Sequence, residues 1–237
     1  MIEIQRLGQT VGAWLDYYYA VSSTQKILAE SAVRFPIVGF LERQDNIKVQ
    51  LEYKHSVFVT RRIDIEWECR KNEMKLGLME VKYIRKDSMS EEEKQRIIND
   101  LIRLGMLPKD DTSARYFLLC GDRTLFDNLF CIRKNSAKNR QSSQQIIRLS
   151  PKQSFKKSYG YRKLKTHLDY WLDFNKSDKR VVTCKSFRQN FLRRFAIEYY
   201  GNDNYKKMRI GWAFTTSLMY VKQDGRSFVG IWKIEQE

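Results

Sequence analysis

The chain has few of the residues that build disulfide frameworks or zinc sites. Its 237 residues include four cysteines and two histidines. The cysteines lie far apart and form no C-x-x-C pair, which argues against a structural zinc site and against a disulfide framework. A Ser-His or Cys-His nucleophilic system would need one of the two histidines beside a suitable nucleophile. We therefore expect reduced thiols in a cytoplasmic protein.

Long apolar runs and nucleotide-binding motifs are also absent. No segment approaches the roughly 18 consecutive apolar residues of a membrane-spanning helix. The first ten residues, MIEIQRLGQT, lack the apolar core of a signal peptide. No P-loop, G-x-G-x-x-G or H-E-x-x-H motif occurs. We expect no membrane contact, and the sequence does not support nucleotide-driven or zinc-hydrolase chemistry.

Negative charge is scarce in one part of the chain, the basic region 133–200. This region has 18 basic and 4 acidic residues, whereas the remainder has 26 basic and 24 acidic ones. Such a concentration of positive charge is typical of a surface that binds a polyanion. We expect nucleic acid, with a solvated basic face as the alternative. Interleaved aromatic residues either stack on bases or fill a core. The residues expected to contact phosphate here are Lys156, Lys157, Arg162, Lys163 and Lys165.

The order of predicted elements indicates an α/β protein in two parts. Residues 1–132 are expected to form a core with N-terminal helices. Its predicted elements are a helix at 22–44, strands at 46–56, 57–69 and 75–84, a helix at 88–107 and a strand at 114–121. Pro36 is expected to kink or split the first helix.

Residues 133–237 are expected to form a basic region of mixed helix and hairpin. The polar stretch 134–145 is the candidate linker or mobile loop. A helix is predicted at 187–201, and a terminal hairpin at 209–234 turns at an Asp-Gly pair. Packing of this hairpin on the core is one arrangement that the sequence allows.

Residues 61–83 place acids and a lysine inside a predicted core hairpin. A turn centred on Asn72 would set Asp64 opposite Glu80 and Arg62 opposite Lys82, all on one face. Opposed like charges destabilise a strand pair, and a divalent cation would convert this repulsion into coordination. Oxygen ligands favour Mg²⁺ or Mn²⁺ over Zn²⁺. The alternative is an exposed hairpin that alternates charged and apolar residues for solubility.

The same residues resemble the motif of the PD-(D/E)xK nuclease superfamily, which has the restriction-endonuclease-like fold. The pattern consists of Asp64 in RRIDIEW, followed by Glu80, Val81 and Lys82 in LMEVKY, with Glu30 in ILAESAVRF on the preceding helix. The likeness covers roughly residues 20–121, in the order helix, three strands, helix, strand. Ile63 replaces the proline of the family name.

The resemblance implies a role for each matching residue. Asp64 and Glu80 would bind Mg²⁺ or Mn²⁺, the Val81 carbonyl would complete the metal shell, and Lys82 would assist the attacking water. Glu30 would act as an additional carboxylate. The alternative for Glu30 is an ion pair with the arginine four residues later on the same helix.

Further residues near the predicted site are weaker candidates. His55 and Arg61 are expected to lie near the site, where phosphate contact is one role open to them, together with Arg62. A structural role is favoured for His167, and Gln95 is interpreted as a residue of a helix start. Neither is therefore assigned to the site.

The expected function is a metal-dependent nuclease that hydrolyses phosphodiester bonds, with DNA as the expected substrate and endonuclease cleavage as the expected mode. One alternative is a catalytically silent nucleic-acid-binding subunit of a larger complex. Another is an assembly protein whose aromatic residues form an interface. The sequence leaves open the choice between DNA and RNA, between endonuclease and exonuclease, and the sequence or structure specificity. It also leaves open the pathway and whether the chain works as a homodimer or with a partner protein.

Overall fold

The computed structural model describes residues 2–21, 29–56, 61–84, 91–107, 113–124, 172, 179–183, 213–222 and 224–237, with the main chain alone over 91–95. Within these ranges the chain forms three helices and seven strands. In chain order they are α1 (Ile4–Val21), α2 (Glu30–Glu42), β1 (Ile47–Lys54), β2 (Arg62–Cys69), β3 (Lys75–Ile84), α3 (Glu91–Gly105), β4 (Ala114–Asp122), β5 (Arg180–Thr183), β6 (Ala213–Lys222) and β7 (Ser227–Gln236).

The seven strands form one mixed sheet in the order β1-β2-β3-β4-β7-β6-β5. The β3–β4 pair is parallel, and the other neighbouring strands are antiparallel. A parallel pair needs a crossover connection, and α3 lies in the segment between β3 and β4. The predicted α/β class is therefore confirmed. The terminal hairpin, β6 and β7, joins the sheet through the pairing of β7 with β4.

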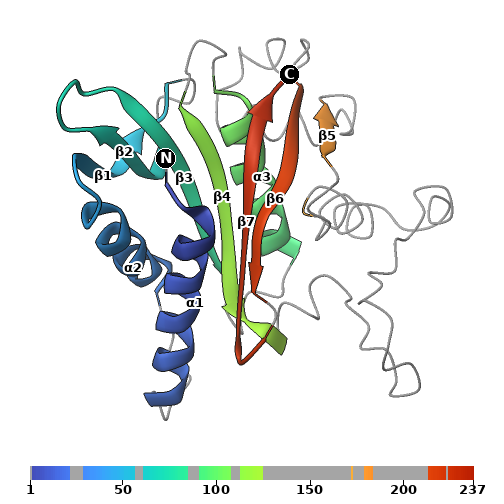
Figure 1. Cartoon of the computed structure of the whole chain (residues 1–237). Helices are drawn as coiled ribbons and strands as arrows, with labels where there is room; N and C mark the ends of the chain where they lie inside the picture. The colour runs from blue at the N-terminus through green and yellow to red at the C-terminus, as the bar shows by residue number, and fades with distance from the viewer. Residues whose placement is uncertain are drawn as a thin grey trace, which may run out of the picture.

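Helices cover both faces of the sheet (Figure 1), with α1 and α2 on one face and α3 on the other. Alternate side chains of β3 point to these two helical layers. Met79 and Val81 join the core formed with α1 and α2, whereas Glu80 contacts Arg103 of α3. α1 contributes Leu7, Val11 and Leu15 at a spacing of four residues.

Most of the predicted elements between 46 and 121 are observed. β3 has the predicted bounds, and β1, β4, α3 and the terminal hairpin lie within their predicted segments to within two residues. Gly225, in the predicted turn, has a φ of +70°, which a residue without Cβ adopts at little cost. Pro36 lies inside the continuous helix α2, so it does not split the helix. The alternative of a kink at Pro36 stays a prediction.

Two elements were not assigned from the sequence, α1 and the short edge strand β5. The predicted helix at 187–201, the linker at 134–145 and most of the basic region lie outside the described residues. The division into two parts at residue 132 stays a prediction. Within the described ranges, none of the helices combines the length and apolar character needed to cross a membrane.

Candidate active site

The predicted pairing of β2 with β3 is observed, and it ends at the predicted site. Ile65 pairs with Met79, Glu66 with Leu78 and Trp67 with Gly77, which is the register expected from a turn centred on Asn72. No pair joins the two strands beyond Ile65 and Met79. Asp64 and Glu80, the next residues in register, therefore lie where β2 separates from β3.

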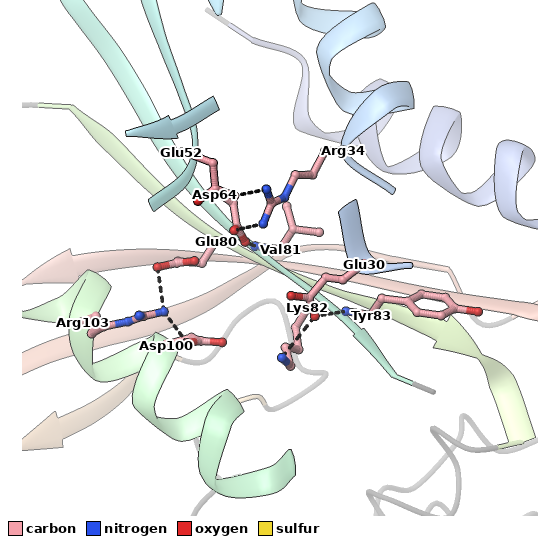
Figure 2. Close-up of polar contacts among 10 residues, drawn as sticks. All are labelled: Glu30, Arg34, Glu52, Asp64, Glu80, Val81, Lys82, Tyr83, Asp100 and Arg103. Atoms are coloured by element: carbon pink, nitrogen blue, oxygen red, sulfur yellow. Dashed lines mark hydrogen bonds and ion pairs between the residues drawn. The ribbon is translucent and has the colours of Figure 1, made fainter. Parts of the chain in front are cut away.

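Carboxylates take the place of the missing strand partner. The Val81 N–H donates a hydrogen bond to Asp64 Oδ2 at 2.7 Å. Two residues further along β3, the Tyr83 N–H donates to Glu30 Oε2 at 3.3 Å. Buried backbone donors need an acceptor, so these bonds fix the two side chains at the opening between the strands (Figure 2).

Glu30 joins the predicted site and does not pair with Arg34. Its Oε2 lies 3.1 Å from the Nζ of Lys82. Arg34 instead forms ion pairs with Glu52 of β1 and Asp64 of β2. The structure thus brings Glu30, Asp64, Glu80 and Lys82 together from α2, β2 and β3.

Helix α3 supplies two further charged residues. Glu80 Oε1 lies 3.1 Å from the Nη2 of Arg103, and the Glu80 side chain is 4% exposed. Arg103 also pairs with Asp100, one turn earlier on the same helix. This arrangement holds the Glu80 carboxylate against the α3 face of the sheet (Figure 2).

Sequence reasoning missed four residues of this site, which are Arg34, Glu52, Asp100 and Arg103. A signal existed for Asp100, which lies three residues after the buried Ile97 and thus at the border of the apolar stripe of α3. Arg34 was weighed only as a partner for Glu30. No sequence pattern marks Glu52.

The carboxylate cluster is defined here as Glu30, Glu52, Asp64, Glu80 and Asp100. The basic side chains in contact with it in Figure 2 are Arg34, Lys82 and Arg103. Glu52 and Glu30 are partly exposed, at 46% and 26%, so water screens their charge. For the more buried Asp64, Glu80 and Asp100, protons or an added cation would offset negative charge that Arg34, Lys82 and Arg103 leave uncompensated.

Burial and mutual repulsion favour the protonated forms of three of these acids. Burial, reinforced by the charge of Asp64, raises the pKa of Glu80 well above its usual value. Burial also raises the pKa of Asp64, against the opposing effects of Arg34 and the Val81 N–H. Asp100 reaches a pKa of about 6 because its burial outweighs the nearby Arg103 and Lys82.

Asp64 and Glu80 influence each other's ionisation. Burial is the main cause of the raised pKa of Glu80, and the negative charge of Asp64 adds to it. Glu80 is also the more buried of the two, with its side chain 4% exposed against 13% for Asp64. Groups that interact in this way titrate as a pair.

Glu52 has an unusual backbone for a strand residue. Its φ is +57°, in the left-handed region that costs a non-glycine residue about 1–3 kcal/mol. The flanking pairs, Leu51 with Ile65 and Tyr53 with Ile63, keep one register, so no residue has been inserted. Glu52 therefore lies opposite Asp64 without pairing to it.

His55 requires a correction. The sequence suggested that it contacts phosphate, but it is 1% exposed. Its Nε2 lies 3.1 Å from the carbonyl oxygen of Arg103. A buried ring that bonds to the α3 backbone is not available to a nucleic acid, so we assign His55 a structural role.

Of the other residues predicted to contact nucleic acid, some lie within the described residues and the rest lie outside them. Arg62 is exposed and Arg61 half-buried, so both can reach solvent near the site. Lys156, Lys157, Arg162, Lys163, Lys165, His167 and the side chain of Gln95 lie outside the described residues. Their predicted roles stay predictions.

The described carboxylates are not arranged as a complete set of metal ligands. Among the residues that the structure describes, no group of three or more His, Cys, Asp or Glu side chains is arranged to hold a metal ion. Arg34 and Arg103 already contact the carboxylates of Asp64 and Glu80. Comparison with protein-family models, curated proteins and solved structures gives no match for this chain.

Proposed function

We propose that the protein is a metal-dependent nuclease with a restriction-endonuclease-like core, acting on DNA as an endonuclease. The observation that carries the proposal is the gathering of Glu30, Asp64, Glu80 and Lys82 where β2 leaves β3. Burial raises the pKa of both Asp64 and Glu80, and perturbed pKa values of this kind cluster at functional sites.

The residues present suit a hard divalent cation. The donors are carboxylate oxygens without a nearby His or Cys ligand, which favours Mg²⁺ or Mn²⁺. Asp64 and Glu80 would hold the ion in their ionised forms, in keeping with the proton release that accompanies metal binding.

The main chain can supply a third ligand. The Val81 N–H points to Asp64. Within a strand the N–H and C=O groups of one residue point to the same edge, and β2 does not pair with β3 at this level. The carbonyl oxygen of Val81 is therefore directed toward the same opening, as the resemblance to PD-(D/E)xK nucleases implies.

Lys82 and Glu30 complete the proposed chemistry. Water on a bound divalent ion is more acidic than free water, and the ion offsets charge on a phosphate. The Lys82 ammonium, held 3.1 Å from Glu30 Oε2, would orient that water and stabilise negative charge on the phosphate. Glu30 would position Lys82 and accept a proton.

The substrate and the compartment follow from the rest of the chain. The basic region, with 18 basic and 4 acidic residues, would bind the phosphate backbone of DNA. Among the described cysteines, Cys69 and Cys120 are free thiols, which suits the reducing cytoplasm. The region's lysines and arginines named above would make these phosphate contacts.

A second candidate is a catalytically silent nucleic-acid-binding protein. It is favoured by the contacts of Arg34, Lys82 and Arg103, which neutralise the carboxylates without any metal. In that case the charged groups would be structural, and the basic region alone would account for the function.

Cleavage assays distinguish the two candidates. Supercoiled plasmid, linear duplex, single-stranded DNA and RNA would be incubated with the protein in Mg²⁺, Mn²⁺ or EDTA. We expect cleavage of plasmid with a divalent ion and none in EDTA. Asp64→Asn should abolish cleavage and weaken Mn²⁺ binding, because it removes a ligand charge. Lys82→Met should abolish cleavage and keep Mn²⁺ binding.

Lys48→Met is the matched control, since Lys48 forms an exposed ion pair with Glu68 across the same β1–β2 pair. It should cut like the parent. A parent protein that binds DNA but neither binds Mn²⁺ nor cuts any substrate would establish the silent candidate instead.

A further inference from the structure

Arg34 occupies an unusual position between two carboxylates of different exposure. Its guanidinium contacts both Asp64, whose side chain is 13% exposed, and Glu52, whose side chain is 46% exposed. Figure 2 shows the guanidinium reaching from α2 toward both acids. Its buried Nε has no hydrogen-bond partner among the described residues, so the group has donor capacity beyond these two ion pairs.

The exposure of the acids indicates where the cluster opens to solvent. It rises from 4% for the Glu80 side chain through 13% for Asp64 to 46% for Glu52. Glu52 is therefore the first of these charges that a phosphodiester meets from this side, and its carboxylate repels phosphate. The guanidinium of Arg34, whose side chain is 15% exposed, contacts Glu52 and offsets this repulsion.

Glu52 is held in place at a conformational cost. Its positive φ takes it out of the β1–β2 ladder opposite Asp64, and such a conformation persists only where the surrounding structure maintains it. The result is a carboxylate that anchors Arg34 from the solvent side while Asp64 binds it from the inside.

We propose that Arg34 is a phosphate-binding residue that leaves Asp64 when a divalent cation binds there, while Glu52 keeps it anchored. The proposal rests on the nuclease function proposed above. A cation on Asp64 competes for the oxygen that Arg34 now contacts and repels the guanidinium. The released N–H groups then face the solvent opening, where a planar guanidinium binds phosphate in a bidentate manner that lysine cannot reproduce.

The two residues have opposite effects on metal binding in this arrangement. Arg34 competes with the cation for Asp64, so its removal strengthens cation binding. Glu52 draws Arg34 away from Asp64, so loss of its charge leaves Arg34 more firmly on Asp64 and weakens cation binding. Charge alone also predicts these opposite shifts, because loss of a nearby cation favours metal binding and loss of a nearby anion opposes it. The KM for DNA therefore separates phosphate binding by Arg34 from a merely structural ion pair.

The test combines Mn²⁺ titration calorimetry in the absence of DNA with steady-state cleavage of duplex DNA at saturating Mn²⁺. Arg34→Met should bind Mn²⁺ about tenfold more tightly, the size expected for loss of one close charge contact. Glu52→Gln should bind it more weakly than the parent. In cleavage, Arg34→Met should raise KM for DNA about tenfold with a smaller change in kcat, and Arg34→Lys should recover only part of this loss.

Lys48→Met again serves as the control for loss of an ion pair on β1 and β2, and should match the parent in both assays. Equal Mn²⁺ affinity in Arg34→Met and the parent, or an unchanged KM, would overturn the role of Arg34 while leaving the nuclease in place. Arg34→Lys keeps the charge and provides the KM comparison if Arg34→Met does not fold. A parent that neither binds Mn²⁺ nor cuts DNA would overturn both proposals.

Discussion

Two junctions of the same sheet differ in how completely their strands pair. Between β4 and β7, eight residue pairs run without interruption from Arg115 with Ile234 to Asp122 with Ser227. Between β2 and β3, four pairs are formed, with a register shift among them. Side chains of Asp64 and Glu30 bond the β3 backbone where β2 has separated.

The difference shows where stability and chemistry lie in this fold. The β4–β7 junction buries apolar side chains on both faces, such as Leu118 and Ile231 toward α1 and Phe117 and Trp232 away from it. The β2–β3 junction exchanges strand pairing for carboxylates, and it buries charges that carry a desolvation cost. The uninterrupted pairing of β3 with β4 and of β4 with β7 helps to offset this cost.

The largest effect is expected on removing the cation that contacts Glu80. Arg103→Met leaves Glu80 and Asp100 buried without their shared partner, which should lower the free energy of unfolding by about 3–5 kcal/mol at pH 8. Urea denaturation measures this loss. Lys179→Met removes a cation from an exposed pair with Glu235 on the far side of the sheet and should cost under about 1 kcal/mol. Equal losses would show that the β2–β3 charges are not effectively buried.

The next effect is the pH dependence of the folding stability that arises from Asp100. Its pKa is raised from 3.8 to about 6 by burial, so the folded protein holds this proton more tightly than the unfolded chain. The corresponding stability is fully present below pH 3.8 and is lost as pH rises through about 6. The raised pKa corresponds to about 3 kcal/mol.

Comparison with Asp100→Asn isolates this contribution from other acids. In EDTA, the parent should lose stability relative to Asp100→Asn as the pH is raised from 4 to 8, as followed by urea denaturation at each pH. A parallel pH dependence in both proteins would contradict the assignment of a raised pKa to Asp100.

The smallest effect is expected on removing one methyl group from a buried isoleucine at each of the two junctions. Ile65 and Ile231 are both fully buried in the core formed with α1 and α2. Ile65→Val and Ile231→Val should each cost about 1 kcal/mol in urea denaturation. Because Ile65 forms the last pair before Asp64, only Ile65→Val should also weaken Mn²⁺ binding in calorimetry. The same Mn²⁺ affinity in both variants would show that pairing at Ile65 does not position Asp64.

Much of the sheet could be predicted because strand patterns are local. The bounds of β3 and its register with β2 follow from the run KLGLMEVKYI and a turn at Asn72. α1 was missed although its apolar residues repeat every four positions, a pattern that is typical of an amphipathic helix. β5 has four residues, too few for a distinctive alternation.

For the candidate site, too, some residues could be predicted from the sequence and others could not. Glu30, Asp64, Glu80 and Lys82 were predicted together, and the structure brings them together. His55 was predicted as a candidate for phosphate contact because it was expected to lie near the site, but its ring turns inward to the α3 backbone. Position in sequence could not show this, because the contact joins residues 48 positions apart.

The sequence by itself determined which side chains of β2 and β3 share a face, because alternation is a property of each extended strand. It also determined the charge imbalance between the basic region and the remainder. Only the tertiary structure decided that Arg34 contacts Asp64 and Glu52, and that Arg103 contacts Glu80. These partners depend on where β2 separates from β3 and on how α2 and α3 pack. Both are set by the balance of burial and charge across the whole sheet, which no short stretch of sequence contains.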